Sequence, residues 1–573
     1  MPNIKISVIL TCFTLVVSSC FLDKPALWNG PTLTQPRVQL TVQDLQSDST
    51  YSLMDMSFFA KPDWAGKALD SFSGTISFTD TEMIFPIERA YYPGENLFPG
   101  FTIGFISHQG ELIPTQKNRI ITINQSESLW DVVVGTGMVW HEETDGGWSR
   151  ASFPLTLTER YIGPARNCVA TFVFKSDAIS NIYMQCSQET ADLNDLQVGN
   201  IRASLQARFD PEIGTDSTKL IDKHRQFNSR KLPVYPLSMI DSNNEISEHF
   251  EESLFTNAPT SLGAVLMDGK LYAHPPQTRH GQYPYPGEMR HGVYSVTKSM
   301  AGTLSLLYFA ERYSVDIFDK LITDYVPTLA DHPGWQGVTF SHTLNMVTGT
   351  VGSERAEHLF EILIKARTAE EAIQNIATLG NTPSAPGQTF NYASTNLFVL
   401  SYALQNYVEE KEGRQINYWD IIHENVLIPI GAEYFTLRQT LEIDGAKGIP
   451  ILAYGALPTL DEAAKISLLL TNEGNYQGKQ ILHKGKTREA LGRTTWTGYS
   501  TNNDYRGSRY RLGYWSTDVR TNDCRVDVTY MLGYGGNYVL FLPSNAVIIR
   551  FMDEYNLDFE DLVQSVERVK SSC

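Results

Sequence analysis

The chain has 573 residues, more than one hydrophobic core normally organises, so we expect about two to four domains. Hydrophobic residues make up 42% and charged residues 19% of the chain, which is typical of globular proteins and argues against wholesale disorder. The formal net charge of −18 disfavours nucleic acid and anionic membrane surfaces as partners.

The first twenty residues have the layout of a secretory signal. Lys5 precedes an apolar run of about ten residues, too short to span a bilayer. The run ends in VSSC, which resembles the lipobox of bacterial lipoproteins, where small residues precede a cysteine that is lipidated. We expect a signal peptide over residues 1–19 and a lipid anchor on Cys20, and an ordinary signal peptide with a chance cysteine is the alternative. Phe21, rather than Asp, follows the cysteine and favours the outer membrane, so we expect a protein of the bacterial cell envelope that faces the periplasm or the exterior.

Residues 20–205 are expected to form a β-rich domain. Short alternating runs recur there, separated by Gly, Asn, Asp and Pro, as in GTISFTDTEMIF, LWDVVVGTGMVW and CVATFVFKS. Such spacing is typical of a β-sandwich. No catalytic constellation occurs in this region, so we interpret it as a structural or binding module.

Residues 206–245 are polar and interrupted by Pro and Gly, which is typical of a junction between domains. Residues 246–573 form the second domain. There, SLGAVLMDGKLYAH predicts a hairpin that turns at Asp268 and Gly269. The following pattern predicts helices over 295–313, 368–379, 395–411 and 459–472, and the chain then returns to strands. Strands at both ends with helices between them predict an α+β domain, an antiparallel sheet plus a helical subdomain, whose terminal strands share the sheet.

Two of the six cysteines lie in the signal segment and at the lipidation site. Four remain, and an even number in an exported protein suggests two disulfides. The simplest pairing is Cys168 with Cys186 and Cys524 with Cys573, one bridge in each domain. The sequence does not determine the connectivity, and four free thiols are the alternative.

Several catalytic motifs are absent. There is no G-x-S-x-G elbow, which argues against an α/β-hydrolase, and neither H-E-x-x-H nor C-x-x-C occurs. GNYQGKQ is similar to a phosphate-binding loop, but its spacing is short by one and Gln480 stands where Ser or Thr is required, so it predicts a hairpin turn. We expect neither a metal nor an organic cofactor.

Ser295 and Lys298, in YSVTKSM, lie one helical turn apart and therefore on one face. A serine at a helix N-terminus lies where developing negative charge is favoured. The apolar residues that follow predict a buried helix, and a buried lysine that loses its proton can act as a base. The alternative is a capping serine and a lysine that reaches solvent.

The wider sequence favours the first interpretation. Over roughly residues 245–560 it resembles the serine β-lactamase and penicillin-binding-protein superfamily, particularly its class C-like esterase and amidase branch. The matching segments come in family order: GAVLMDGKLYAH, YSVTKSM, VTFSHTLNMVTG, PGQTFNYASTNLFVLSYAL, LPTLDEAAKISLLLTNEGNYQGKQIL and YGGNYVLFLPSNAVIIRF.

The resemblance implies roles for individual residues. Ser295 would be the acylated nucleophile and Lys298 its proton acceptor. Tyr392 would be the second-motif tyrosine, which relays the proton between the nucleophile and the leaving group, as phenolate or through Lys298. The backbone N–H groups of Ser295 and Tyr534 would form the oxyanion hole. The third motif would include Gly535, Gly536 and Asn537.

Two departures from the β-lactamase pattern bear on the substrate. Ser394 stands where the family's β-lactamases have Asn, two residues after the tyrosine. YMLGYGGN carries no lysine or histidine, whereas β-lactamases have Lys-Thr-Gly, whose cation pairs with the substrate carboxylate. The Tyr-x-Ser variant resembles members that hydrolyse esters or linear amides, such as the 6-aminohexanoate-dimer hydrolases. His291 and His342 lie near the motifs and are interpreted as structural, because this family needs no histidine.

The resemblance thus implies a lipid-anchored serine hydrolase that forms an acyl-enzyme with a small ester, amide or peptide-like substrate. One alternative is a peptidoglycan DD-peptidase or a true β-lactamase. Another is a non-catalytic, penicillin-binding-like protein that kept the fold, against which the intact Ser295, Lys298 and Tyr392 argue.

Overall fold

The computed structural model of the protein describes residues 30–47, 52–84, 93–160, 165–188, 200–212, 216–251, 261–352, 354, 359–443, 446–501, 507–552 and 557–573. The predicted signal segment and Cys20 lie outside the described residues. Within them, no helix is both long enough and apolar enough to cross a bilayer.

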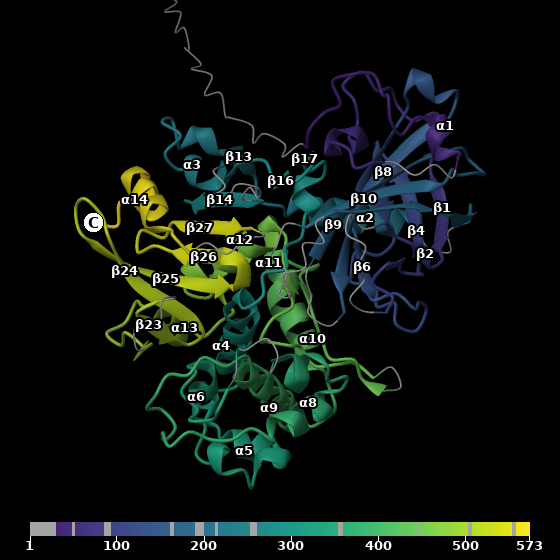
Figure 1. The fold of residues 1–573 in the computed structure, drawn as a ribbon. Coiled ribbons are helices and arrows are strands. Elements are labelled where there is room, and N and C mark those ends of the chain that lie inside the picture. Colours follow the sequence, from purple (N-terminus) through teal and green to yellow (C-terminus); the bar gives the residue numbers. More distant parts are fainter. Residues whose placement is uncertain are drawn as a thin grey trace, which may run out of the picture.

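The N-terminal domain is built on one ten-stranded antiparallel sheet, at the right of Figure 1. The strand order is β11-β10-β9-β8-β7-β5-β4-β1-β12, and β6 pairs with β8. The strands are β1 (Ser73–Phe78), β4 (Thr102–His108), β5 (Glu111–Pro114), β6 (Trp130–Val134), β7 (Gly137–Trp140), β8 (Ser149–Glu159), β9 (Ala165–Phe174), β10 (Ile182–Gln188), β11 (Asn200–Leu205) and β12 (Ala207–Asp210). A short pair, β2 (Thr81–Glu82) and β3 (Leu97–Phe98), and the helix α1 (Val42–Leu45) flank it.

The two edges of this sheet meet on one chain segment. Only Gln206 separates β11 from β12, yet β11 pairs with β10 and β12 pairs with β1. The sheet therefore curls into a near-barrel, which removes open edges. The β-rich prediction is confirmed, but the strands form one curled sheet where two stacked sheets were expected, because the last segment serves both edges.

Phenylalanine rings fill the barrel. Phe72 lies at the centre, with ring centroids 5.2 to 6.4 Å from its neighbours Phe105, Phe172, Phe174 and Phe209. Edge-to-face packing of this kind stabilises an interior beyond simple burial.

The second domain is built on a nine-stranded sheet of order β13-β15-β14-β27-β26-β25-β24-β23-β22. Its strands are β13 (Val234–Pro236), β14 (Leu262–Met267), β15 (Lys270–Ala273), β22 (Tyr499–Ser500), β23 (Arg509–Arg511), β24 (Tyr514–Arg520), β25 (Arg525–Gly533), β26 (Asn537–Phe541) and β27 (Val547–Phe551). The pairing of β14 with β27 joins the two ends of the domain, as predicted. The hairpin of β14 and β15 turns at Asp268 and Gly269, also as predicted.

The helices of this domain are α3 (Glu248–Glu251), α4 (Leu304–Arg312), α5 (Ile322–Tyr325), α6 (Phe340–Leu344), α8 (Ala369–Ile376), α9 (Ser394–Glu412), α10 (Tyr418–Ile422), α11 (Ile428–Ile430), α12 (Leu460–Thr471), α13 (Lys484–Ala490) and α14 (Glu560–Val569). The predicted helical segments correspond to α4, α8, α9 and α12. Local chemistry sets their limits: Thr459 and Glu462 form a capping box at the start of α12, and Gly413 ends α9 in the left-handed conformation.

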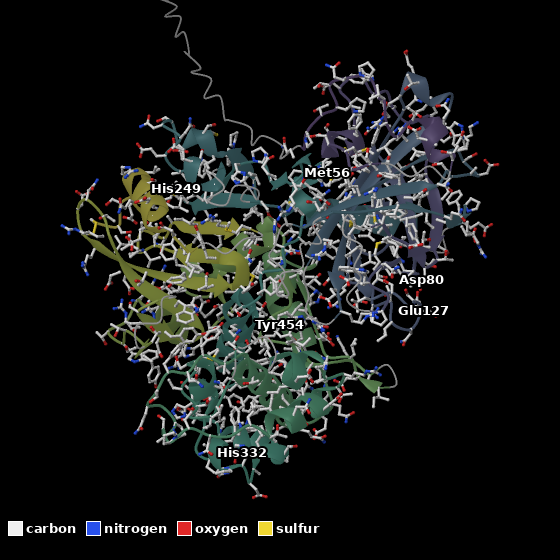
Figure 2. The ribbon with its side chains drawn as sticks, in the orientation of Figure 1. Met56, Asp80, Glu127, His249, His332 and Tyr454 are labelled. Carbon is white, nitrogen blue, oxygen red and sulfur yellow. A yellow bond between two sulfur atoms is a disulfide. The ribbon has the colours of Figure 1, made fainter. Side chains whose placement is uncertain are left out.

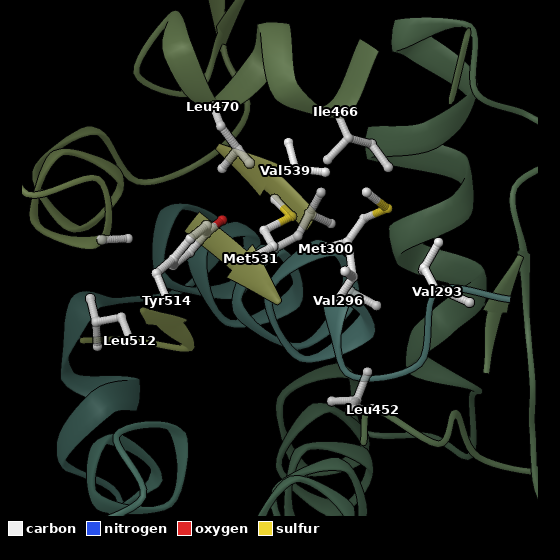
Figure 3. Packing of buried hydrophobic residues seen from close by; sticks show 14 of the residues in the cluster. Val293, Val296, Met300, Leu452, Ile466, Leu470, Leu512, Tyr514, Met531 and Val539 are labelled. Atoms are coloured by element: carbon white, nitrogen blue, oxygen red, sulfur yellow. The ribbon is translucent and has the colours of Figure 1, made fainter. Parts of the chain in front are cut away.

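Side chains of the second sheet alternate between its two faces. Met531 of β25 and Val539 of β26 lie on the face toward Val296 and Met300, which belong to the motif YSVTKSM at the start of the helical segment (Figure 3). On the other face, Phe559 at the start of α14 packs edge-on against Tyr530 and Tyr538. The sheet is therefore the support against which this helical segment is held.

Both expected disulfides form. Cys168 and Cys186 lie opposite each other on β9 and β10 and are bonded, inside the barrel. Cys524, just before β25, is bonded to Cys573, the last residue after α14. The simplest pairing is the one in the structure.

Both sheets extend into the expected junction. The strand β12 belongs to the barrel and β13 to the second sheet, and the helix α2 (Ser217–Ser229) lies between them. Residues 206–245 are thus largely regular structure rather than an open linker, although the domain limits themselves stay predictions.

The barrel contacts a short segment that leads to Ser295. The Asn167 side chain donates to the Arg290 carbonyl (2.7 Å) and accepts from the Arg290 N–H (3.0 Å). The hydroxyls of Tyr283 and Tyr285 donate to backbone carbonyls of β9 and β8. Residues 283–290, called the docking segment below, are thereby bound to the barrel.

A buried ion pair also holds the docking segment. Lys117 Nζ lies 2.9 Å from a Glu288 oxygen, and Lys231 Nζ lies 3.6 Å from it. Burial opposes ionisation of Glu288, but the two lysines outweigh burial and lower the pKa of Glu288 to about 2. The carboxylate is therefore charged at neutral pH.

Candidate active site

Ser295 lies at the turn that precedes the helix, at the end of a strained backbone segment. Tyr294, just before it, has a φ of 45°, a left-handed conformation that costs a non-glycine residue about 1–2 kcal/mol. Its ring packs edge-on against Tyr534, with centroids 5.7 Å apart. Gly533 allows this approach, since a Cβ there would lie 2.1 Å from the Val293 carbonyl oxygen. The start of the helix is therefore tightly packed against the end of β25.

Lys298 is buried, with 1% of its surface exposed, and contacts three oxygens. Its Nζ donates to Ser295 Oγ at 2.7 Å, to Ser394 Oγ at 2.9 Å and to the Ala453 carbonyl at 2.9 Å. These contacts hold the amine directly against the serine hydroxyl, at a distance suited to proton transfer.

Tyr392 lies beside the same amine. The centroid of its ring is 4.9 Å from Lys298 Nζ. The ring also packs against Trp515 (5.3 Å) and, edge-on, Tyr510 (6.1 Å), both buried. The structure therefore brings together four of the predicted residues: Ser295, Lys298, Tyr392 and Ser394.

Glu354 joins this group, and the sequence did not indicate it. Its carboxylate accepts hydrogen bonds from the Ser394 backbone N–H and from Ser394 Oγ, the latter at 3.1 Å. A continuous chain of contacts thus runs from Ser295 through Lys298 and Ser394 to Glu354. The residue lies five positions after the end of the segment VTFSHTLNMVTG, outside every motif.

Close backbone packing places the Glu354 loop against the second motif. A Cβ at Gly352 would lie 1.9 Å from that of Ala393, so only glycine fits there. Asn391 Nδ2 also donates to the Thr350 carbonyl at 3.1 Å. The loop is therefore fitted to the start of α9.

The predicted third motif lies at the turn between β25 and β26. Tyr534 is 38% exposed, and Gly535 and Gly536 both have positive φ. Asn537 is buried and pins the turn, because its side chain donates to the Tyr534 carbonyl (2.7 Å) and accepts from the Met552 N–H (3.2 Å). The contact of Tyr534 with Tyr294 brings this turn beside Ser295; the oxyanion role of its N–H stays a prediction.

The two nearby histidines occupy structural positions. Burial lowers the pKa of His291 to about 3, so its ring is neutral, and it packs against Phe551. His342 caps α6, where its Nδ1 accepts from the Thr339 N–H at 3.2 Å. Gln480 lies in the short hairpin of β20 (Asn475–Tyr476) and β21 (Lys479–Gln480), as predicted. No cluster of His, Cys, Asp or Glu able to hold a metal ion occurs in the described part of the chain.

The fold and this group of residues define a class of proteins, the serine hydrolases that use a lysine one turn after the serine. Residues 257–552 match the family model described as Beta-lactamase. This match spans just over half of the chain, and the chain belongs to the β-lactamase family, whose members are typically serine hydrolases.

Solved structures with a similar arrangement include three hydrolases. One is assigned as a 6-aminohexanoate-dimer hydrolase from Bacillus anthracis (17% identity, 55% of this chain and 78% of that chain, TM-score 0.42). The others are a D-stereospecific amidohydrolase from Streptomyces sp. (15%, 56% and 97%, 0.42) and a D-amino acid amidase from Ochrobactrum anthropi SV3 (16%, 57% and 97%, 0.40). No curated protein matches the chain.

Proposed function

We propose that the protein hydrolyses an ester or a linear amide through an acyl-enzyme at Ser295. The observation that carries this proposal is the 2.7 Å contact between Lys298 Nζ and Ser295 Oγ in a buried polar site. A capping serine and a solvent-directed lysine do not account for this contact, because Lys298 is 1% exposed and its amine donates to three oxygens inside the protein.

In the proposed reaction, Ser295 Oγ attacks the substrate carbonyl carbon while Lys298, or Tyr392 beside it, takes the hydroxyl proton. The backbone N–H groups of Ser295 and Tyr534 stabilise the oxyanion. The bond to the alcohol or amine then breaks, and that leaving group receives the proton. Water next attacks the acyl carbon, which releases the acid and returns the proton to Ser295.

The surroundings of the site favour esters and linear amides over penicillins. Ser394 already contacts both Lys298 and Glu354, and it lacks the side-chain amide of the asparagine that β-lactamases carry. The turn at Gly535 and Gly536 has no cation for a substrate carboxylate. A lost charge-assisted hydrogen bond of about 1.5–3 kcal/mol corresponds to about ten- to a hundred-fold in kcat/KM.

A fluorophosphonate and intact-mass analysis test the nucleophile. We expect one phosphonyl adduct on the wild-type protein and none on Ser295→Ala. Ser299→Ala is the matched control, because Ser299 is on the same helix but bonds the Gly513 carbonyl (2.6 Å) instead of Lys298. An adduct that survives in Ser295→Ala would refute the proposal and favour a non-catalytic role for this serine.

The reaction with penicillin distinguishes the proposed esterase or amidase from a β-lactamase or a DD-peptidase. We expect measurable turnover of short p-nitrophenyl esters and poor turnover of penicillins and cephalosporins. Efficient nitrocefin hydrolysis, or a stable adduct of labelled penicillin at Ser295, would instead identify a β-lactamase or a DD-peptidase while leaving the acyl-enzyme mechanism intact.

We also propose that Cys20 is lipidated and anchors the protein in the cell envelope, which the VSSC segment supports. Mass spectrometry of membrane-extracted protein should find acyl chains on Cys20. Soluble mature protein cut at another position would exclude this anchor.

A further inference from the structure

A large groove, separate from the residues around Ser295, runs between the barrel and the hydrolase domain. Its volume is about 1290 Å³, enough for a ligand of considerable size. The barrel side consists of the loop 118–124 and Asp131, and the hydrolase side includes Trp419 of α10 and much of 433–451.

Three isoleucines that line this groove are open to solvent. Ile121 and Ile123 of the barrel loop are 53% and 42% exposed, and Ile443 of the hydrolase side is 72% exposed. All three line the groove, and buried Leu363, Ile364 and Phe435 line it further in. Exposed aliphatic side chains gathered at one groove are characteristic of a binding surface.

A buried cation also lines the groove. Arg438 is 6% exposed, and its Nη1 has no hydrogen-bond partner among the described residues. Its guanidinium carbon lies 5.7 Å from the centroid of the Tyr454 ring; Figure 2 labels Tyr454. A buried guanidinium donor without an acceptor is costly, so a group that supplies an acceptor is favoured there.

The acids that line the groove are already occupied. Asp131 accepts from Arg119 at 2.6 Å and from the Thr122 N–H at 3.0 Å. Glu442 accepts from the Ala369 N–H and from Thr440, while Asp420 and Glu433 pair with Lys447 and Arg230. Arg438 is therefore the cation of this groove whose buried Nη1 lacks an acceptor among the described residues.

We propose that this groove binds an aliphatic carboxylate, with the carboxylate on Arg438 and the hydrocarbon chain along Ile121, Ile123 and Ile443. The carboxylate supplies the acceptor that Nη1 lacks, and the chain covers the exposed isoleucines. The inference concerns binding outside the hydrolytic site, so it does not depend on the proposed acyl-enzyme.

Calorimetric titration of the full chain with dodecanoate tests the proposal. We expect saturable binding near one equivalent. Dodecyltrimethylammonium, with the same chain and the opposite charge, and acetate, with the charge and almost no chain, should both bind at least about ten-fold more weakly. Equal binding of the ammonium compound would overturn the role of Arg438, and absence of dodecanoate binding would overturn the site.

Two variants locate the bound carboxylate. Arg438→Met should weaken dodecanoate binding about ten-fold or more, whereas Arg367→Met, an exposed arginine of the same groove, should change it less than about three-fold. The ligand-free Arg438→Met protein should unfold at the same or a higher temperature, because a buried N–H donor that lacks an acceptor is removed. A lower unfolding temperature with unchanged binding would make Arg438 a structural residue and refute the proposal.

The exposed isoleucines supply a test that folding cannot obscure. Ile443→Asp places a charge at a position that is 72% exposed, so it should leave the fold intact and weaken dodecanoate binding. Ester turnover by this variant should be unchanged, which separates this site from Ser295. Unaltered dodecanoate affinity would place the hydrocarbon chain elsewhere and contradict the proposed path.

Discussion

The interior of the barrel and the site around Ser295 are both buried, but they contain different kinds of groups. Around Phe72, aromatic rings meet one another, and the Cys168–Cys186 disulfide lies among apolar neighbours. Around Lys298, a buried amine meets three oxygens. Polar groups are costly to bury, so a buried amine that contacts three oxygens marks a candidate site for chemistry, whereas the aromatic interior of the barrel contributes packing.

Removal of the nucleophile gives the largest expected effect. Ser295→Ala should abolish p-nitrophenyl ester turnover while leaving the unfolding temperature within a few degrees of wild type, because only one hydroxyl is lost. Steady-state kinetics and thermal unfolding measure the two quantities. Wild-type rates of ester turnover in Ser295→Ala would refute the acyl-enzyme mechanism at Ser295.

Loss of proton transfer should be the next largest effect. Lys298→Ala and Tyr392→Phe should each lower ester turnover by about 10²–10⁴, typical of lost general acid–base catalysis. The measurement is kcat/KM on the same esters. Turnover close to wild type in either variant would show that its side chain is not needed for the reaction.

A barrel substitution should show the opposite pattern. Phe172→Ala removes a ring that is fully buried between Phe72 and Phe153, which should cost about 3–5 kcal/mol of stability. Ester turnover per folded molecule should change little, since the substitution is remote from Ser295. Urea unfolding measures the loss, with Leu69→Ala, 57% exposed, as the control. A large loss of kcat without a loss of stability would contradict the view that the barrel contributes packing rather than chemistry.

The contact between the two domains should depend on pH. Because the pKa of Glu288 is lowered to about 2 from an ordinary value of 4.5, its contribution to stability is present above pH 4.5 and is lost as the pH falls toward 2. Glu288→Gln should flatten this part of the stability profile, whereas Glu361→Gln, in an exposed pair, should not. Unfolding by denaturant at pH 2.5 to 6 is the measurement, and identical profiles for all three proteins would refute the assignment.

The smallest effect concerns Glu354. Glu354→Gln keeps an oxygen for the Ser394 N–H, so kcat/KM should change by less than about five-fold. Glu354→Ala leaves that N–H without its acceptor, which at about 1–3 kcal/mol predicts roughly a ten-fold loss. If both variants have wild-type kcat/KM, the contact of Glu354 with Ser394 does not contribute to the reaction.

Local patterns allowed much of the hydrolase domain to be predicted. The S-x-x-K spacing placed Ser295 and Lys298 in contact, and the Asp268–Gly269 turn and the helical pattern over 459–472 marked elements that the structure contains. These signals are short-range, so a sequence displays them directly. Ser394 was placed in its motif, but its contact with Lys298 was not anticipated.

Long-range features could not be predicted in the same way. Closure of the barrel depends on pairing between β1 and β12, which are more than 120 residues apart, and an alternating strand pattern is compatible with a sandwich or a barrel. Glu354 can reach Ser394 because Gly352, which has no side chain, leaves room for Ala393. Gly352 and Ala393 are 41 residues apart, so no local sequence pattern predicts their contact.

The docking segment links the order in which the two domains fold to the position of Ser295. It ends five residues before Ser295, and Asn167 and Lys117, which bind it, belong to the half of the chain that is synthesised first. The barrel can therefore fold before Ser295 is synthesised, and its contacts are then in place to bind the docking segment. A chain with an unfinished barrel would lack the contacts that hold the segment leading to Ser295.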